Sequence, residues 1–151
     1  MKLLKFNLLL IVFLLGACSS NSYDIGKVAS QINFEIVERN IDSDGASYSI
    51  KLINNSDEII AQNTVYISYP IKTINGGSKT NQLKVETTGN KLDISPGEEV
   101  ILSAYISSEN FENNENLIVE DPEIQFDGYI NKVQSENKVG IITSFSHEEG
   151  K

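Results

Sequence analysis

The chain has 151 residues, which corresponds to one ordinary domain with little room for a second. Its 12 basic and 21 acidic residues give a net charge of −9, which argues against a nucleic-acid partner because phosphate binding needs a basic surface. One Cys and one His exclude a zinc cluster, a disulfide framework and a Cys–His nucleophile pair within the chain, and no cofactor motif is present.

The chain begins with a segment typical of export signals. Lys2 and Lys5 supply a cationic start, and an unbroken apolar run covers residues 8–15. A membrane-spanning helix needs about 20 apolar residues, and the apolar stretch that ends at Ala17 is shorter. We therefore predict that residues 1–17 form a signal peptide that is removed.

A four-residue motif, Leu15-Gly16-Ala17-Cys18, closes this segment. It resembles the lipobox of bacterial lipoproteins, in which the processing enzyme cuts before the Cys and the thiol receives a diacylglyceryl group. The resemblance implies lipidation of Cys18 and, with further acylation by palmitate-type chains, stable attachment to a bilayer. It implies a lipid-anchored protein on the extracytoplasmic face of the cell membrane, or in the outer membrane if the host has two membranes. An ordinary signal peptide with a chance Cys is the alternative.

Residues 19–31 are small and polar, without sustained periodicity. Together with the lipidated Cys they are predicted to form a flexible tether over residues 18–31. Such a chain has a root-mean-square reach of about 20 Å, so the domain is expected to stay close to the bilayer.

From residue 32 onward, apolar and polar residues alternate with a period of two, which is the pattern of strands with one buried face. No window shows a helical apolar stripe with caps. Turn residues such as Asp42-Ser43-Asp44-Gly45 separate the runs, and Pro70 is expected at a strand end or on an edge. Strands are expected over residues 32–36, 47–52, 65–71, 100–106, 124–130 and 139–145.

Short strands separated by turns predict an all-β fold, a single antiparallel sandwich of about seven or eight strands over residues 32–147, followed by a tail at 148–151. The stretches 50–60 and 92–100 are similar to turns of bacterial immunoglobulin-like and fibronectin-III-like sandwiches. The Cys and Trp pattern of antibody-type domains is absent. The resemblance implies an immunoglobulin-like fold and no particular activity.

Three kinds of side chain are candidates for a site. The acidic stretch 109–123 contains oxygen ligands of the type that calcium prefers, although a solvated loop has the same composition. His147 lies too close to the end of the chain for a positioned general base. Tyrosines on the exposed face of the predicted strands are candidate partner-facing residues: Tyr66, Tyr105 and Tyr129.

These observations favour a membrane-anchored, non-enzymatic binding or accessory module of the cell envelope. Its expected partners are the lipid bilayer, through acylated Cys18, and an envelope protein. The alternative is a lipoprotein that binds a cation or small ligand with the acidic 109–123 stretch, and a hydrolytic enzyme comes third.

Overall fold

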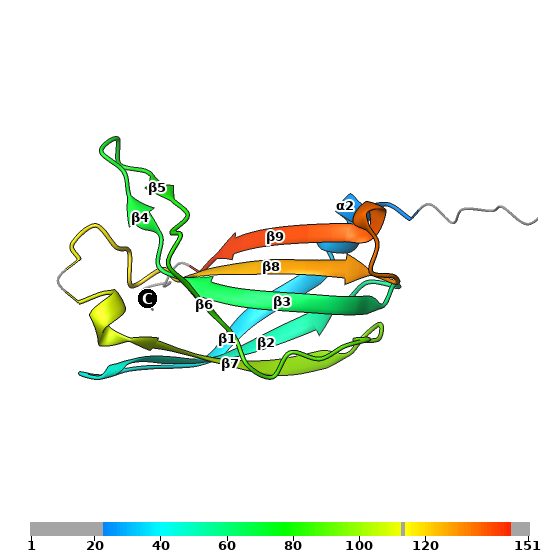
Figure 1. Cartoon of the computed structure of the whole chain (residues 1–151), viewed down its shortest axis with the longest axis horizontal. Coiled ribbons are helices and arrows are strands. Elements are labelled where there is room, and N and C mark those ends of the chain that lie inside the picture. Colours follow the sequence, from blue (N-terminus) through cyan, green and yellow to red (C-terminus); the bar gives the residue numbers. More distant parts are fainter. Residues whose placement is uncertain (1–22, 113, 146–151) are drawn as a thin grey trace, which may run out of the picture.

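Two antiparallel sheets form the body of the protein in a computed structural model that describes residues 23–112 and 114–145 (Figure 1). The first sheet has the order β1-β2-β7, and the second has the order β6-β3-β8-β9. The all-β sandwich that the sequence predicts is confirmed. The strands of the first sheet are β1 (Ile32–Ile41), β2 (Gly45–Asn54) and β7 (Glu99–Ser107), and those of the second are β6 (Lys84–Glu86), β3 (Ile60–Ser68), β8 (Glu123–Ile130) and β9 (Lys138–Ser144).

The predicted alternation is seen clearly in β7. Val100, Leu102, Ala104 and Ile106 are buried, whereas the residues between them are exposed. Phe126 in β8 has no exposed surface, and its ring lies 5.9 Å from that of Phe34 in the opposite sheet. The core is therefore built between the two sheets from one face of each.

The turn that joins β1 to β2 is the Asp42–Gly45 turn predicted from the sequence. The Asp42 carboxylate accepts hydrogen bonds from the backbone N–H groups of Asp44 at 2.9 Å and Gly45 at 3.1 Å. This carboxylate therefore supports a hairpin turn, as expected for Asp at such a position.

Asn54, at the end of β2, is buried and organises the next turn. Its side-chain amide donates to the carbonyl oxygens of Glu58 at 2.8 Å and Ile94 at 3.0 Å. Its side-chain oxygen accepts from the Ser56 hydroxyl at 2.7 Å and the Ser56 N–H at 3.2 Å. One side chain thus joins the β2–β3 connection to the segment that leads into β7.

The N-terminal part of the described chain differs from the predicted flexible tether. Helix α2 (Ile25–Ala29) is capped by the Asp24 carboxylate, which accepts from two N–H groups of the first turn. Val28 is buried, and the Tyr23 hydroxyl donates to the Ile130 carbonyl at 3.0 Å. The prediction of a flexible tether up to residue 31 is therefore wrong for residues 23–31, which pack against the sandwich.

A two-stranded arm projects from the opposite end of the sandwich (Figure 1). It consists of β4 (Ile71–Lys72) and β5 (Ser78–Lys79), which pair with each other, and Ile71 at its base also forms an isolated bridge with Leu117. The strand predicted over residues 65–71 ends before Pro70, as expected for a residue that cannot donate to a ladder. Short 3-10 helices, η1 (Ser108–Asn110) and η2 (Ser135–Asn137), complete the described elements.

Candidate functional site

The three candidate tyrosines lie on exposed strand faces, but on two different sheets. Tyr66 in β3 and Tyr129 in β8 belong to the second sheet, and Tyr105 in β7 belongs to the first. Within the second sheet, Tyr66 pairs with Gln125, four residues before Tyr129. Four residues along a strand span about 13 Å, so the three rings form no common stacking platform.

Tyr66 is half-buried and its ring is already covered. The Lys84 ammonium lies 4.0 Å from the ring centroid, a cation–π contact. Lys84 also donates to the Gln125 side chain at 2.8 Å, and Gln125 donates to Asp127 at 2.8 Å. A planar ligand on this face would have to displace the lysine from the tyrosine.

Tyr105 is 53% exposed and supports the β1–β2 turn. Its hydroxyl donates to the Asp44 carbonyl at 2.7 Å. The ring lies close above Gly45, where an added Cβ would come within 2.8 Å of the ring carbon that carries the hydroxyl. The structure thus assigns Tyr105 a contact within the fold and leaves more than half of its surface exposed.

The acidic stretch 109–123 packs along the body of the protein. Arg39 donates to the carbonyl oxygens of Val119 at 2.7 Å and Glu120 at 2.9 Å. Glu123 belongs to β8 and is 6% exposed, with the Thr80 hydroxyl 3.4 Å from one carboxylate oxygen. Within the described residues, no group of three or more His, Cys, Asp or Glu side chains is placed to hold a metal ion.

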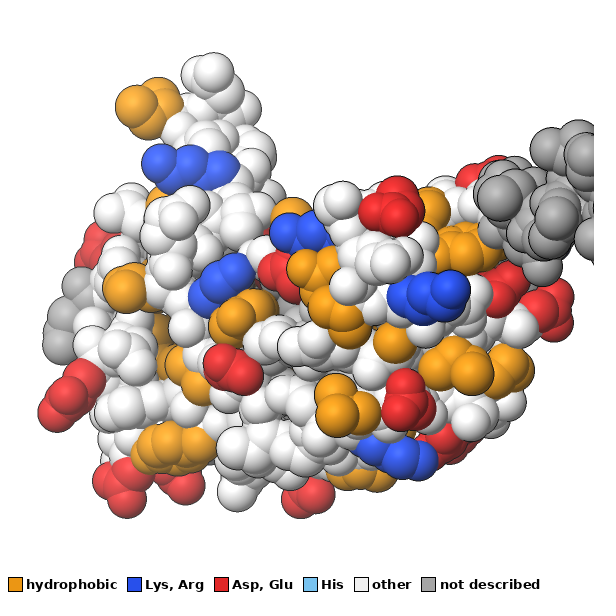
Figure 2. All heavy atoms as spheres, turned by 45° about the vertical axis from the view of Figure 1, so that its right-hand side comes forward, with side chains coloured by type: hydrophobic (Ala, Val, Ile, Leu, Met, Phe, Trp, Pro, Cys, Tyr) orange, Lys and Arg blue, Asp and Glu red, His pale blue; other side chains and the backbone are white. Residues whose placement is uncertain are grey.

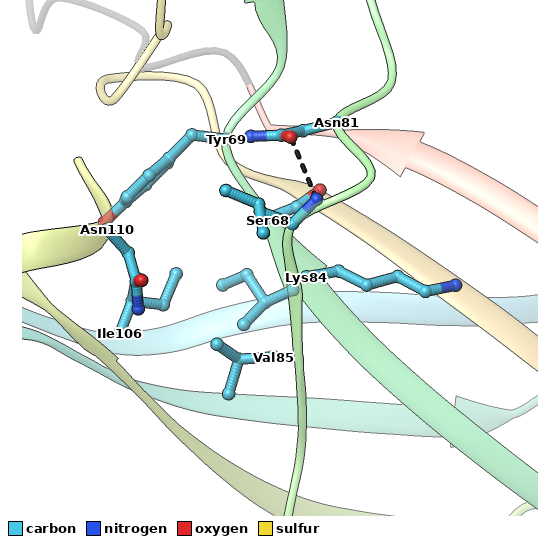
Figure 3. Close-up of a pocket in the computed structure, with 9 residues that line it drawn as sticks. Ser68, Tyr69, Asn81, Lys84, Val85, Ile106 and Asn110 are labelled. Atoms are coloured by element: carbon cyan, nitrogen blue, oxygen red, sulfur yellow. Dashed lines mark hydrogen bonds between the residues drawn. The ribbon is translucent and has the colours of Figure 1, made fainter. Parts of the chain in front are cut away.

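A small cavity opens at the edge between β3, β6 and β7, with a volume of about 110 Å³ (Figure 3). Its lining is largely apolar and includes the polar residues Ser68, Asn81 and Asn110. The Asn81 side chain is held in place because its oxygen accepts from the Leu83 N–H at 2.9 Å. The volume is below the roughly 300 Å³ at which pockets for drug-sized ligands begin.

Tyr69 lies at the edge of this cavity and forms a buried hydroxyl pair with Tyr48. The two oxygens are 2.7 Å apart. Burial raises the pKa of both phenols, and the hydrogen bond with Tyr48 raises the pKa of Tyr69 further. Both hydroxyls therefore stay protonated at neutral pH, and the pair joins the two sheets through a neutral hydrogen bond.

The arm was not predicted as a site from the sequence. Ile74 at its tip is the most exposed large hydrophobic side chain among the described residues, at 105% of the reference value. Residues 70–84 include three lysines and no acidic residue, in a chain with 21 acidic residues. This local excess of lysines in an acidic chain is the sequence signal from which the arm could have been predicted as a site.

Several of the sequence predictions fall on residues outside the described ranges. The signal peptide at 1–17, the lipidated Cys18, the tether up to residue 22, His147 and the tail at 148–151 all lie there. In the part of the chain that the structure describes, no helix is long and apolar enough to cross a membrane.

The described residues define a protein of the all-β, antiparallel sandwich class. No protein-family model matches the chain, and no curated protein matches it. Among solved structures, the chain is similar to a FixG-related protein from Vibrio parahaemolyticus, at 14% identity over 78% of this chain and 97% of that chain, with a TM-score of 0.36. This similarity is too low to bear on function.

Proposed function

We propose that this protein is a lipid-anchored extracytoplasmic lipoprotein that acts as a non-enzymatic binding or accessory module of the cell envelope. The observation that carries the proposal is the motif Leu15-Gly16-Ala17-Cys18, which contains the only cysteine of the chain. The bilayer is one partner, through the acylated Cys18. The other is an envelope protein, met through the exposed sheet faces or the loops.

The start of the folded domain supports this arrangement. Tyr23 is hydrogen-bonded to β8, five residues after Cys18. Five residues span at most about 18 Å when fully extended. The end of the sandwich that carries α2 would therefore lie close to the bilayer.

The net charge of the mature chain indicates that the acyl chains, and not electrostatic attraction, must keep the protein at the bilayer. Removal of residues 1–17 removes Lys2 and Lys5 and no acidic residue, so 12 − 2 = 10 basic residues remain against 21 acidic ones, a net charge of −11. A protein with this net charge gains nothing overall from the negative surface potential of a bilayer. Two or three acyl chains on one Cys attach a protein stably to a bilayer, whereas a single acyl chain gives only marginal binding.

Anchoring can be tested with the double variant Leu15→Ala/Cys18→Ala. It removes the thiol and leaves Ala-x-Ala, the small-residue pattern that ordinary signal peptidase cuts. We expect the wild type in the membrane fraction with labelled palmitate incorporated, and the double variant in the released fraction without label. Fractionation, palmitate labelling and the mass of the N-terminal peptide measure this.

Leu15→Ala alone is the matched control, because it keeps Cys18 and is expected to remain acylated and membrane-bound. A wild-type N-terminal peptide whose mass contains no acyl chain would refute the proposal. So would a double variant that is cut at the new site and still sediments with membranes after a carbonate wash.

A further inference from the structure

The tip of the arm presents one aliphatic side chain without any cover. Ile74 is fully exposed, and the turn around it is held by hydrogen bonds between Thr73 and Gly77. The Thr73 N–H donates to the Gly77 carbonyl at 2.8 Å, and its hydroxyl accepts from the Gly77 N–H at 3.1 Å. Gly76 supplies the positive φ of 81° that this turn requires. Because the tip is already ordered, a contact at Ile74 would cost little further conformational entropy.

Two lysines stand just behind this tip. Lys72 pairs with Ser78, and Lys79 pairs with Ile71, so the two lysines lie on opposite faces of the arm. Both are exposed, and neither ammonium has a hydrogen bond or salt bridge within the described residues. Lys51 and Lys91, in contrast, form salt bridges with glutamates. The arm thus carries two free positive charges in a strongly acidic protein.

The base of the arm is fixed to the body. The Lys72 N–H donates to the Asn116 carbonyl at 2.7 Å, and the Ile118 N–H donates to the Pro70 carbonyl at 2.8 Å. The arm is therefore a fixed projection, and its direction relative to the sandwich is defined.

We infer that the arm is a second membrane contact, in which Ile74 enters the headgroup region and Lys72 and Lys79 bind the phosphates of anionic lipids. The arm has an aliphatic side chain at its tip and two lysines farther from the tip. This order matches a bilayer surface, where an aliphatic group enters the apolar region and the methylene chain of a lysine lies along it while the ammonium stays at the phosphates. Cationic side chains next to a membrane are attracted by its negative surface potential. The inference rests on the proposed lipid anchor for its geometry.

The positions of the arm and α2 fit this attachment. They lie at opposite ends of the long axis, and the arm projects from the side of the body on which β9 and α2 lie (Figure 1). With both ends in contact, the sandwich would lie along the bilayer. Figure 2 shows basic and hydrophobic side chains on the arm, and acidic side chains both along the opposite border of this face and on the side of the body from which the arm projects. The arm extends beyond the body on that side, so its lysines would reach the bilayer surface first.

The anchor also explains how so small a contact could suffice. One aliphatic side chain and two lysines bind a vesicle weakly on their own. Once Cys18 is held in the same bilayer, the arm binds as an intramolecular step with a high effective concentration. The expected state is an anchored protein with its arm engaged.

The chain has no tryptophan, so Ile74→Trp places the only tryptophan of the variant at the tip. The acylated variant is purified, reconstituted into phosphatidylglycerol vesicles, and compared with Leu92→Trp, a control at a position that is 65% exposed. We expect a blue-shifted emission and protection from acrylamide for Ile74→Trp, and neither for Leu92→Trp. Phosphatidylcholine vesicles are expected to give a smaller shift.

Neutralising the lysines tests the electrostatic part. Lys72→Gln/Lys79→Gln, combined with Ile74→Trp, is expected to reduce the equilibrium constant for arm engagement on phosphatidylglycerol about 25-fold, because each lysine contributes about a factor of five at an anionic surface. Lys132→Gln/Lys138→Gln changes the net charge equally outside the arm and is expected to leave the emission unchanged.

An acylated Ile74→Trp protein that is as accessible to acrylamide on these vesicles as Leu92→Trp would overturn the inference. Protection seen only on intact cells would overturn it as well and assign the arm to an acidic envelope protein. Failure of the proposed anchor is recognised separately, because the N-terminal peptide would then carry no acyl chain in its mass.

Discussion

Phe126→Ala is expected to lower the free energy of unfolding by about 4 kcal/mol, the largest effect of any single substitution proposed for this protein. Phe126 has no exposed surface and lies in β8, between its register partners Val65 and Ile141. Its ring also contacts Phe34 of the other sheet. The truncation removes the aromatic contact between the sheets and leaves a cavity that the strands on either side cannot fill without breaking their ladders.

Urea unfolding followed by circular dichroism measures this effect. Ile142→Ala in the neighbouring strand β9 is the control, because Ile142 is 57% exposed and its truncation is expected to cost less than about 0.5 kcal/mol. A loss for Phe126→Ala that is no larger than for Ile142→Ala would show that the core is not organised around this ring.

Asn54→Ala is expected to lower the free energy of unfolding by about 3 kcal/mol. The change removes the four hydrogen bonds of the Asn54 side chain, although the Glu58 and Ile94 carbonyl oxygens still accept from the Ser56 hydroxyl at 3.2 Å and the Ile60 N–H at 3.0 Å. Each lost hydrogen bond lowers the stability by about 1 kcal/mol, and water that enters the new space offsets part of the sum. Asn54→Asp is expected to be no better, because a carboxylate oxygen would then face those carbonyl oxygens.

The neighbouring substitution Asn55→Ala serves as the matched control. Asn55 is exposed and its backbone N–H, which the substitution keeps, donates to the Gln31 carbonyl at 2.9 Å. We expect a change within about 0.5 kcal/mol. If Asn54→Ala unfolds at the same urea concentration as Asn55→Ala, the hydrogen bonds of Asn54 contribute no net stability.

The two proposals describe one arrangement at the cell envelope. The acylated Cys18 would hold one end of the sandwich near the bilayer, and the arm would bring the other end down beside it. The β1–β2–β7 and β6–β3–β8–β9 sheets would then present their exposed faces sideways and outwards. Any protein partner would meet these faces with the orientation of the sandwich already set.

Local rules were sufficient for the strands and for several turns. The period of two in β7 predicted which of its side chains are buried, since successive residues of a strand point to opposite faces. Pro70 was expected at a strand end or on an edge because it has no N–H to donate, and β3 ends just before it, at Ser68, although the predicted strand ran to residue 71. The Asp42 turn followed from the ability of a short carboxylate to accept hydrogen bonds from the backbone two and three residues on.

Other features depended on contacts between residues far apart in the chain. Residues 23–31 were predicted to be part of a tether because a helix as short as α2 shows no apolar stripe in the sequence. In the structure, the hydroxyl of Tyr23 donates to the carbonyl of Ile130, which is 107 positions away in the chain. Glu123 belongs to an acidic run but is buried, because it lies in β8 beside the segment that returns from the arm.

The sequence by itself determined the all-β class, because apolar and polar residues alternate with a period of two, as in strands that have one buried and one exposed face. It also predicted the lipid anchor, because the lipobox is a short linear motif that can be identified without knowledge of the fold. Only the tertiary structure decided which exposed groups share a surface. Strand alternation placed Tyr66, Tyr105 and Tyr129 on exposed faces, but Tyr105 belongs to the first sheet, and Tyr66 and Tyr129 are about 13 Å apart along the second. Ile74 lies in an ordinary turn of the sequence, and it stands alone at the tip of the arm because no sheet extends that far.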